Sequence, residues 1–205
     1  MIYKEFIHLL RTAETFEEID ARRDEIAEML PSCAIMLDYP QDHPYHPYDL
    51  WEHSVRTVVE MPGDRKDDIL YLGAFLHDIG KPGARQEPDP NDLSVMYRGH
   101  PEAGVEYTVK YVLPELPACG CELTEEETER LLFYIRHHDD CIWREVDEVK
   151  ELVKDMDPET ACNLMYIEIG DGLTHLQAPL MVKRIEVCRE VIRWLEGQAA
   201  GRSEN

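Results

Sequence analysis

The chain has 205 residues, of which 43% are hydrophobic and 31% charged, as in an ordinary globular protein. Its 21 basic residues are outnumbered by 43 acidic ones, and a net charge of −22 repels a phosphate backbone and excludes an extended nucleic-acid interface. No stretch approaches 18 consecutive apolar residues, so we expect no membrane span. The start, MIYKEFIHLL, lacks the pattern of a secretory signal, and we expect a cytoplasmic protein.

The six cysteines give no disulfide or zinc pattern. Cys119 and Cys121 are the closest pair, but they do not form a CxxC motif and no second pair accompanies them. Reduced thiols in a cytosolic protein are therefore the favoured interpretation. A redox or metal role for this pair is the alternative.

The first third of the chain predicts two helical regions separated by a loop. Thr15-x-x-Glu18 has the pattern of a capping box, and apolar residues follow it at helical spacing as far as Leu30. Pro31 stops this helix, and residues 31–48 form a loop rich in Pro, His and Asp. A second helix begins near Asp49 and ends at Met61-Pro62-Gly63-Asp64.

The segment 67–79, DDILYLGAFLHDI, predicts a buried central helix. Its two leading acids favour a helix N-terminus, and the residues that follow are apolar almost without a break. A buried strand is the alternative, but the length favours a helix. Gly80 and Pro82 stop it directly after His77 and Asp78.

The remainder of the chain also predicts helices. In residues 80–99 the stretch DLSVMYRG is either a short strand or an ordered loop. A second capping box, Thr124-x-x-Glu127, starts one of the helices that follow. We expect those helices at 101–113, 124–138, 144–155, 158–170 and 178–197. The fold class is therefore all-α, a single helical domain without repeats or linkers.

Histidines and aspartates recur where these apolar segments meet loops. Each has a simple interpretation alone: His53 falls on the polar stripe of its helix, and a histidine at a helix end balances the dipole. Neutral imidazole and carboxylate together suit Mn, Fe, Ni, Co, Zn or Mg, and a metal removes the cost of burying the carboxylate charge. The recurrent positions are His53, His77, Asp78, His100, His137, His138 and Asp171.

The ordered set resembles the H…HD…D signature of the HD-domain metal-dependent phosphohydrolase superfamily. In their context the motifs look like those of the HD domain attached to bacterial CCA-adding enzymes and related tRNA nucleotidyltransferases. The segments that carry the resemblance are HPYDLWEHSVRTV (46–58), GAFLHDIGKP (73–82), YRGHPEAGVEY (97–107), FYIRHHDDCI (133–142) and IEIGDGLTH (167–175).

The resemblance implies a stand-alone HD domain. It covers roughly residues 36–176, and no Gly-Ser followed by paired aspartates marks a nucleotidyltransferase head, so CCA addition is set aside. We expect a single HD-domain bundle with its metal site at the helix ends. The expected organisation is an N-terminal helical extension at 1–30, the HD domain at 31–176, a packed C-terminal helix at 177–197 and a disordered tail at 198–205.

The resemblance also assigns residue roles. His53, His77, Asp78 and Asp171 are implied to bind a first metal. His100 and His138 are implied to hold a second one in members with two ions, with Asp78 bridging; His138 is preferred to His137 because the His-Asp pair His138-Asp139 matches the family pattern. Asp78 is the expected proton acceptor. Lys81 is the expected phosphate contact and a catalytic candidate, Arg56 is a weaker substrate-binding candidate, and Arg98 is weaker still.

The expected activity is hydrolysis of a small phosphomonoester or cyclic phosphodiester, a nucleotide foremost, by metal-activated water. The cofactor is one or two divalent ions, and the loops 31–48 and 80–99 are expected to line the pocket. A non-catalytic metal- and nucleotide-binding regulatory module is the alternative. A structural metal site and the oxygen chemistry of diiron HD proteins also stay open, as does oligomer formation.

Overall fold

The computed structural model describes residues 1–62, 66–88 and 94–203, with backbone only from 199 onward. All regular structure in these ranges is helical, which confirms the predicted all-α fold. The first elements are α1 (Tyr3–Thr12), α2 (Phe16–Asp20), α3 (Arg23–Met29), the 3₁₀ turn η1 (Pro31–Met36), α4 (Leu50–Glu60), α5 (Asp68–Leu76) and α6 (Lys81–Ala84). There follow α7 (His100–Tyr107), the π-helical turn η2 (Thr108–Val112), α8 (Leu113–Glu115), the 3₁₀ turn η3 (Leu116–Cys119), α9 (Glu125–His137), α10 (Val146–Val153), α11 (Pro158–Thr174) and α12 (Pro179–Ser203).

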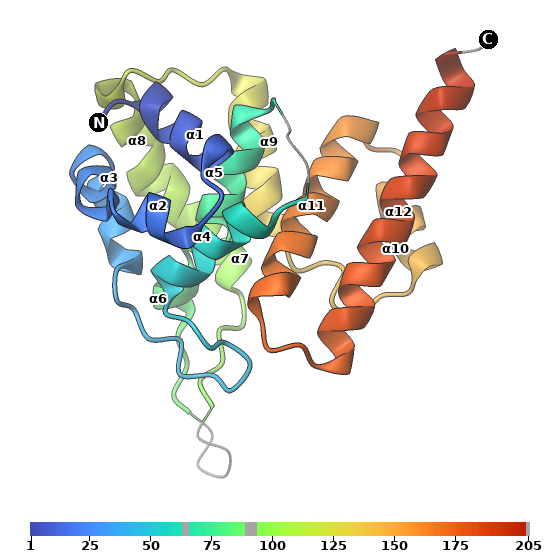
Figure 1. The fold of residues 1–205 in the computed structure, drawn as a ribbon, viewed down its shortest axis with the longest axis horizontal. Helices are drawn as coiled ribbons and strands as arrows, with labels where there is room; N and C mark the ends of the chain where they lie inside the picture. The colour runs from blue at the N-terminus through green and yellow to red at the C-terminus, as the bar shows by residue number, and fades with distance from the viewer. Residues whose placement is uncertain (63–65, 89–93, 204–205) are drawn as a thin grey trace.

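Helix α5 is the centre of the bundle. The Asp67 carboxylate caps it by accepting from the Ile69 N–H at 3.0 Å, and every residue from Ile69 to Leu76 is buried. A helix that is apolar on all sides needs neighbours on all sides, and α5 packs against α1, α4, α9 and α11 (Figure 1). The prediction of a buried central helix is confirmed. Its C-terminal end delivers His77 into the interior.

Helix α11 joins the bundle to the last helix. It packs against α4 on one side and against α12 on the other (Figure 1). The contact with α4 is close because Gly170 has no side chain: a Cβ there would lie 2.5 Å from the Thr57 carbonyl oxygen. This close approach holds α4 and α11 in the register that brings His53 near Asp171.

The N-terminal helices share the core of the rest of the chain. Phe6, Leu10 and Ile26 belong to the same hydrophobic cluster as α5, and the Phe6 and Phe75 rings meet edge to face at 5.3 Å between centroids. The expected single helix up to Leu30 is divided into α2 and α3. The capping box predicted at Thr15 is wrong, because Glu18 accepts from the Glu14 N–H instead and the Thr15 side chain makes no cap bond.

The capping box at Thr124 is present, with the Thr124 hydroxyl accepting from the Glu127 N–H at 3.2 Å. Helix α12, however, continues to Ser203, so the prediction of a tail beginning at 198 is wrong for residues 198–203. The stretch 198–200, Gln-Ala-Ala, has high helix propensity, and one glycine at 197 costs too little to end a long helix. The last two residues lie outside the described ranges.

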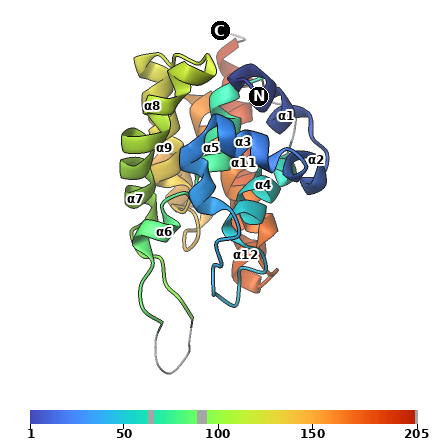
Figure 2. The ribbon, with the colours of Figure 1, turned by 90° about the vertical axis from the view of Figure 1, so that its left-hand side faces the viewer.

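Two long segments project from one end of the molecule, 37–49 and the pair 85–88 and 94–99 (Figure 2). The Val95 N–H donates to the Asp42 carbonyl at 3.0 Å and ties them together. The short strand considered for DLSVMYRG is not formed in the described residues 94–99, while 92–93 and the helix stop at Gly63-Asp64 lie outside the described ranges. No described helix has the length and hydrophobicity needed to cross a bilayer.

The contact at Gly170 gives a direct stability prediction. We expect Gly170→Ala to lower the free energy of unfolding by about 1–3 kcal/mol, because the new methyl group must push α4 away from α11. Gly197→Ala on α12 is the control: nothing lies within 4 Å of its Cβ position, and we expect a gain of about 0.5–1 kcal/mol. Urea unfolding of both variants measures the difference, and equal effects would contradict this packing.

Candidate metal centre

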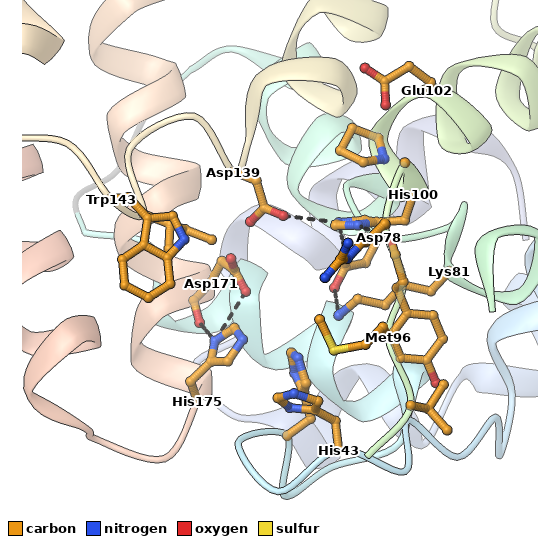
Figure 3. A pocket seen from close by; sticks show the side chains of 17 residues that line it. His43, Asp78, Lys81, Met96, His100, Glu102, Asp139, Trp143, Asp171 and His175 are labelled. Atoms are coloured by element: carbon orange, nitrogen blue, oxygen red, sulfur yellow. Dashed lines mark hydrogen bonds and ion pairs between the residues drawn. The ribbon is translucent and has the colours of Figure 1, made fainter. Parts of the chain in front are cut away.

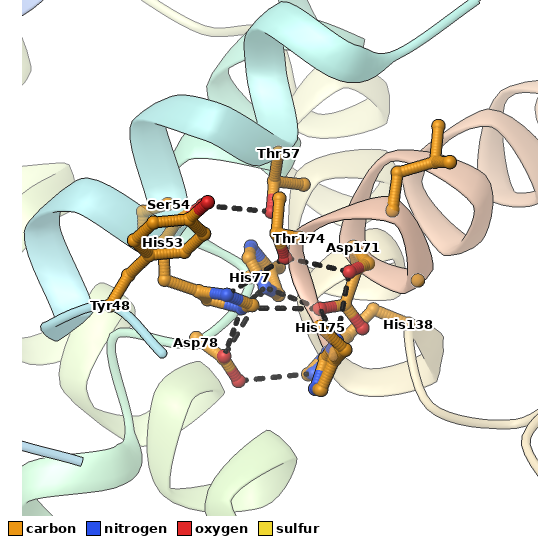
Figure 4. Close-up of polar contacts among 12 residues, drawn as sticks. Tyr48, His53, Ser54, Thr57, His77, Asp78, His138, Asp171, Thr174 and His175 are labelled. Carbon is orange, nitrogen blue, oxygen red and sulfur yellow. Dashed lines mark hydrogen bonds and ion pairs between the residues drawn. The ribbon is translucent and has the colours of Figure 1, made fainter. Parts of the chain in front are cut away.

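The ends of several helices converge on one buried cluster (Figure 4). His53 comes from α4, His77 and Asp78 from the end of α5, and Asp171 from the last turns of α11. His100 begins α7 and His138 follows α9. All six side chains are buried, including His53, which its helical periodicity had placed on a solvated face.

Three of the imidazoles are oriented by main-chain carbonyl groups. In each case Nδ1 lies within hydrogen-bond distance of a carbonyl oxygen three residues earlier in the chain. A carbonyl can only accept, so Nδ1 carries the hydrogen, and in the neutral ring the lone pair is on Nε2. The pairs are His77 with Ala74 at 2.7 Å, His100 with Tyr97 at 2.9 Å, and His138 with Ile135 at 2.8 Å.

The fourth imidazole, His53, has the same tautomer for a different reason. Its Nδ1 lies 2.9 Å from the Thr174 hydroxyl, and that hydroxyl donates its only hydrogen to the Asp171 carbonyl at 2.7 Å. The hydroxyl therefore accepts from His53 Nδ1, and the lone pair of His53 is also on Nε2. All four Nε2 atoms consequently face the same interior.

Within each of two pairs, the Nε2 atoms lie too close together for two neutral imidazole rings with nothing between them. The separation is 3.2 Å between His53 and His77, and 3.0 Å between His100 and His138. Two facing lone pairs at such a distance repel unless a proton or a metal ion lies between them. Asp171 Oδ1 is also buried without a hydrogen-bond donor. The donor set of imidazole nitrogens and carboxylate oxygens therefore fits a divalent metal.

The ligand atoms form two groups that share one carboxylate. His53, His77, Asp78 and Asp171 make the first group, and Asp78 joins His100 and His138 in the second. Asp78 Oδ2 lies 3.0 Å from His53 Nε2, while its Oδ1 lies 3.0 Å from His100 Nε2. The structure thus brings together the six residues that the resemblance implied, with Asp78 between the two groups.

A buried arginine of the last helix supports both groups. The Arg184 guanidinium, 1% exposed, donates to Asp171 Oδ2 at 2.7 Å and to the His138 carbonyl at 2.7 Å. It also donates to Glu168 at 2.6 Å. A guanidinium presents its donors in a fixed plane, so Arg184 sets the relative positions of a ligand from the first group and one from the second.

Lys81 is part of the buried cluster rather than a surface lysine. Its side chain is buried, and Nζ lies 2.5 Å from Asp78 Oδ2 and 2.7 Å from Gln41 Oε1. Around the centre, four carboxylates (Asp78, Asp139, Glu168 and Asp171) therefore meet two fixed cations, Lys81 and Arg184. The excess of negative charge calls for a further cation, which a divalent metal supplies.

Without metal, protons must take its place. Burial opposes the charging of His77, but the charges of Asp78 and Asp171 outweigh it and raise the pKa of His77 to about 10. Burial likewise raises the pKa of Asp78, but Lys81 and His77 outweigh it and hold this pKa well below its usual range. Asp78 therefore stays ionised while His77 takes up a proton, so a metal ion and a proton compete for the Nε2 atom of His77.

Other residues singled out in the sequence lie elsewhere. His137 points away from the cluster and pairs with Asp140 at 2.8 Å, so the structure distinguishes it from His138. Arg56 does not line the cavity described below: its guanidinium pairs with Glu52 and lies over the rings of Phe16 and Tyr48. The structure thus gives no support to Arg56 as a substrate-binding residue, and that role stays a prediction.

The cysteines show no reactive setting. Burial raises the pKa of Cys119 and of Cys121, the reverse of what a reactive thiol needs. Cys141 and Cys188 lie close to Glu168, but Arg184 already occupies that carboxylate, and its positive charge disfavours a metal there. The His/Asp cluster is therefore the stronger candidate for a metal centre.

A cavity of about 540 Å³ opens beside the cluster (Figure 3). Asp78, Lys81, His100 and Asp171 line its inner side, so small molecules can reach the centre from solvent. The loops expected to form the pocket contribute: 31–48 provides His43 and His46, and 80–99 provides residues 95–99.

Sequence reasoning missed Arg184, Thr174 and His175. His175 lines the cavity and approaches Asp171 Oδ1 at 3.4 Å from its Nδ1. For Arg184 a signal existed, because it falls on the stripe formed by Met181, Ile185 and Cys188. A charged residue on an apolar stripe indicates a buried partner of opposite charge.

The raised pKa of His77 predicts how stability depends on pH. Because its folded pKa exceeds the unfolded value of 6.5, the proton on His77 stabilises the metal-free fold below pH 6.5, and this stability is lost as the pH rises toward about 10. We expect calorimetry in chelator to show a melting temperature that falls between pH 6.5 and 8.5. His77→Gln should reduce this slope, whereas His137→Gln should keep it; a flat or rising profile for the wild type would contradict the assignment.

The role of Arg184 predicts a large loss of stability. Arg184→Met leaves buried carboxylates without their cation, and we expect the free energy of unfolding to fall by about 3–5 kcal/mol. Arg189→Met, an exposed position on the same helix, should change it by less than about 0.5 kcal/mol. Denaturant unfolding of the two variants provides the comparison, and similar values would show that Arg184 does not hold the centre together.

Comparison with known families agrees with this geometry. The model of the HD domain matches residues 6–162, more than half of the chain, and the match begins within the segment that we had expected to be an N-terminal extension. A search of the curated proteins finds no match. Asp171 lies beyond the matched range, although the structure places it in the same cluster as His53, His77 and Asp78. The chain belongs to the HD domain family.

Proposed function

We propose that the protein is a metal-dependent phosphohydrolase that acts on a small phosphomonoester or cyclic phosphodiester, with a nucleotide as the foremost example. The observation that carries this proposal is the orientation of four Nε2 lone pairs toward two groups of ligands that share Asp78, next to an open cavity. Two divalent ions, Mn, Fe, Ni, Co or Zn with Mg as a further option, suit this arrangement.

The chain's own residues hold the centre in place for this chemistry. His53, His77 and Asp171 would bind one ion, His100 and His138 the other, and Asp78 both. A bound divalent cation lowers the pKa of a coordinated water and polarises a phosphoryl oxygen. The hydrogen bonds from each Nδ1 keep the imidazoles in the required orientation before any ligand arrives.

Lys81 is positioned to contact the substrate phosphoryl group. It lines the cavity, and an ammonium has three N–H donors, of which two point toward Asp78 and Gln41. The third donor is left for an oxygen atom of the substrate. Its charge also compensates the phosphate, which must otherwise approach an acidic wall.

Proton acceptance fits Asp139 better than Asp78. Both Asp78 oxygens lie 3.0 Å from imidazole nitrogens, so both are already engaged within the cluster. The Asp139 side chain is 31% exposed, lines the cavity and lies 3.3 Å from His100 Nε2. We therefore assign proton acceptance from a water in the cavity to Asp139 and keep Asp78 as the shared ligand.

The cavity distinguishes this proposal from a purely structural metal site. A structural site is closed by its ligands, whereas Asp78 and Asp171 here also line a space of about 540 Å³. A space of this size accommodates a small metabolite. The non-catalytic regulatory module remains the competing function, and turnover decides between them.

The functional test compares two neighbouring histidines. Protein loaded separately with Mn, Co, Ni, Fe and Mg is assayed against phosphomonoesters and cyclic nucleotides, together with His138→Ala and His137→Ala. We expect His138→Ala to lose at least one bound metal and to reduce kcat about 100-fold or more, because it removes a ligand. His137→Ala should retain metal and activity, since its side chain pairs with Asp140 outside the cluster.

Metal content and turnover are measured on the same samples. Binding of metal and nucleotide without product from any substrate would support the regulatory module instead. Equal losses in the two histidine variants would contradict the assignment of His138.

A further inference from the structure

The cavity beside the candidate metal centre is lined by both charged and apolar side chains. Asp78, Lys81 and Asp171 line the inner side, and a single phosphoryl group placed there leaves most of the 540 Å³ unfilled. Met96, Pro101 and Trp143 also line the cavity. The part of the substrate that is not phosphate therefore has apolar side chains within the cavity to pack against.

Trp143 is the most exposed of the large apolar residues that line the cavity. Its side chain is 81% exposed, whereas the described Trp51 is 1% exposed and packs in the core. Figure 3 shows the indole on the side of the cavity formed by Asp139 and Asp171. Because the indole both lines the cavity and is uncovered by the rest of the chain, its face is open to a ligand bound in the cavity.

The turn that carries Trp143 is fixed to the interior. The Cys141 N–H donates to the buried Glu168 carboxylate at 3.0 Å, and the Arg144 N–H donates to the Cys141 carbonyl at 3.2 Å. Arg184, which holds Glu168, also holds the His138 carbonyl at the start of this turn. The backbone that carries the indole is therefore anchored to the same buried groups that hold the cluster in place.

We propose that Trp143 is a specificity-determining residue that stacks on an aromatic ring of the substrate, so that the site prefers monophosphates of ring-containing aromatic compounds. The proposal rests on the proposed function, since it names the substrate class of the same site. A planar ring meets the indole face over a larger area than a puckered saturated ring or a flexible chain.

The charges around the cavity limit the substrate to few phosphates. Lys81 and Arg98 line it as cations, but Glu102 and Asp139 line it as well. An extended polyphosphate would meet these carboxylates, whereas a single phosphoryl group at Lys81 would not. An uncharged distal part of the substrate is not repelled by the Glu102 carboxylate. If that part carries hydrogen-bond donors, it can donate to Glu102.

The experiment uses two probe pairs that keep the leaving group matched. Benzyl phosphate and cyclohexylmethyl phosphate differ in the planarity of the ring, and adenosine 5′-monophosphate and ribose 5-phosphate differ in the presence of a base. The Mn-loaded full chain is assayed with all four. We expect kcat/KM to be about 10-fold higher for the aromatic member of each pair, a value in the range of single-ring stacking.

Variants then test whether the indole causes the preference for the aromatic member of each pair. Trp143→Ala should bring each ratio close to one, and Trp143→Phe should retain most of it because a ring face remains. Tyr111→Ala removes an exposed aromatic side chain that does not line the cavity, and it should leave both ratios unchanged. A wild type without preference, or a ratio that survives in Trp143→Ala, would overturn the proposal.

Binding measurements separate this proposal from the proposed function. If no probe is hydrolysed, calorimetric titration of benzyl phosphate and cyclohexylmethyl phosphate into the Mn-loaded protein replaces the kinetics. Preferential binding of the benzyl compound that disappears in Trp143→Ala would support stacking while the hydrolase proposal fails. Equal binding or none would overturn the role of Trp143. The proposal would also be overturned if Trp143→Ala changed the oligomeric state but left the ratios between the paired probes unaltered. The indole would then contact another protein chain rather than the substrate.

Discussion

The whole site depends on one electrostatic constraint: lone pairs and carboxylates that converge in a buried space must share a cation. Four Nε2 atoms point inward, with the two pairs separated by 3.2 and 3.0 Å, and the Asp171 Oδ1 atom has no hydrogen-bond donor. Lys81 and Arg184 neutralise only part of the surrounding carboxylate charge. Burying charges without compensation costs several kcal/mol for each, so the arrangement is stable only with protons or metal between the ligands.

The fold satisfies this constraint by ending helices at the cluster. Helix α5 is covered on every side, so its C-terminal end is the place where His77 and Asp78 can leave the helix inside the protein. Main-chain carbonyls one turn earlier then orient the imidazoles without further side chains. Helix α12 contributes Arg184, and the centre consequently depends on a segment beyond the residues that match the family.

The sequence predicted the all-α fold and the central helix because apolar runs and capping patterns are local properties. It also identified the residues of the cluster, because they occur in the order of the H…HD…D signature that the sequence resembles. Periodicity failed for His53, which shares a helix face with solvated residues but is covered by α11. The partner of Arg184 and the surroundings of Trp143 could not be predicted, because burial against Glu168 and exposure beside a cavity depend on contacts between distant segments. The pairing of Arg56 with Glu52, in contrast, is a local i,i+4 contact within α4.

The most direct test of this account is a crystal structure of the Mn-loaded protein with anomalous scattering recorded for Mn. The account predicts two anomalous peaks, one adjacent to Nε2 of His53 and His77 and one adjacent to Nε2 of His100 and His138, with Asp78 contacting both. Anomalous peaks confined to the acidic surface, with no Mn among these four Nε2 atoms, would contradict it.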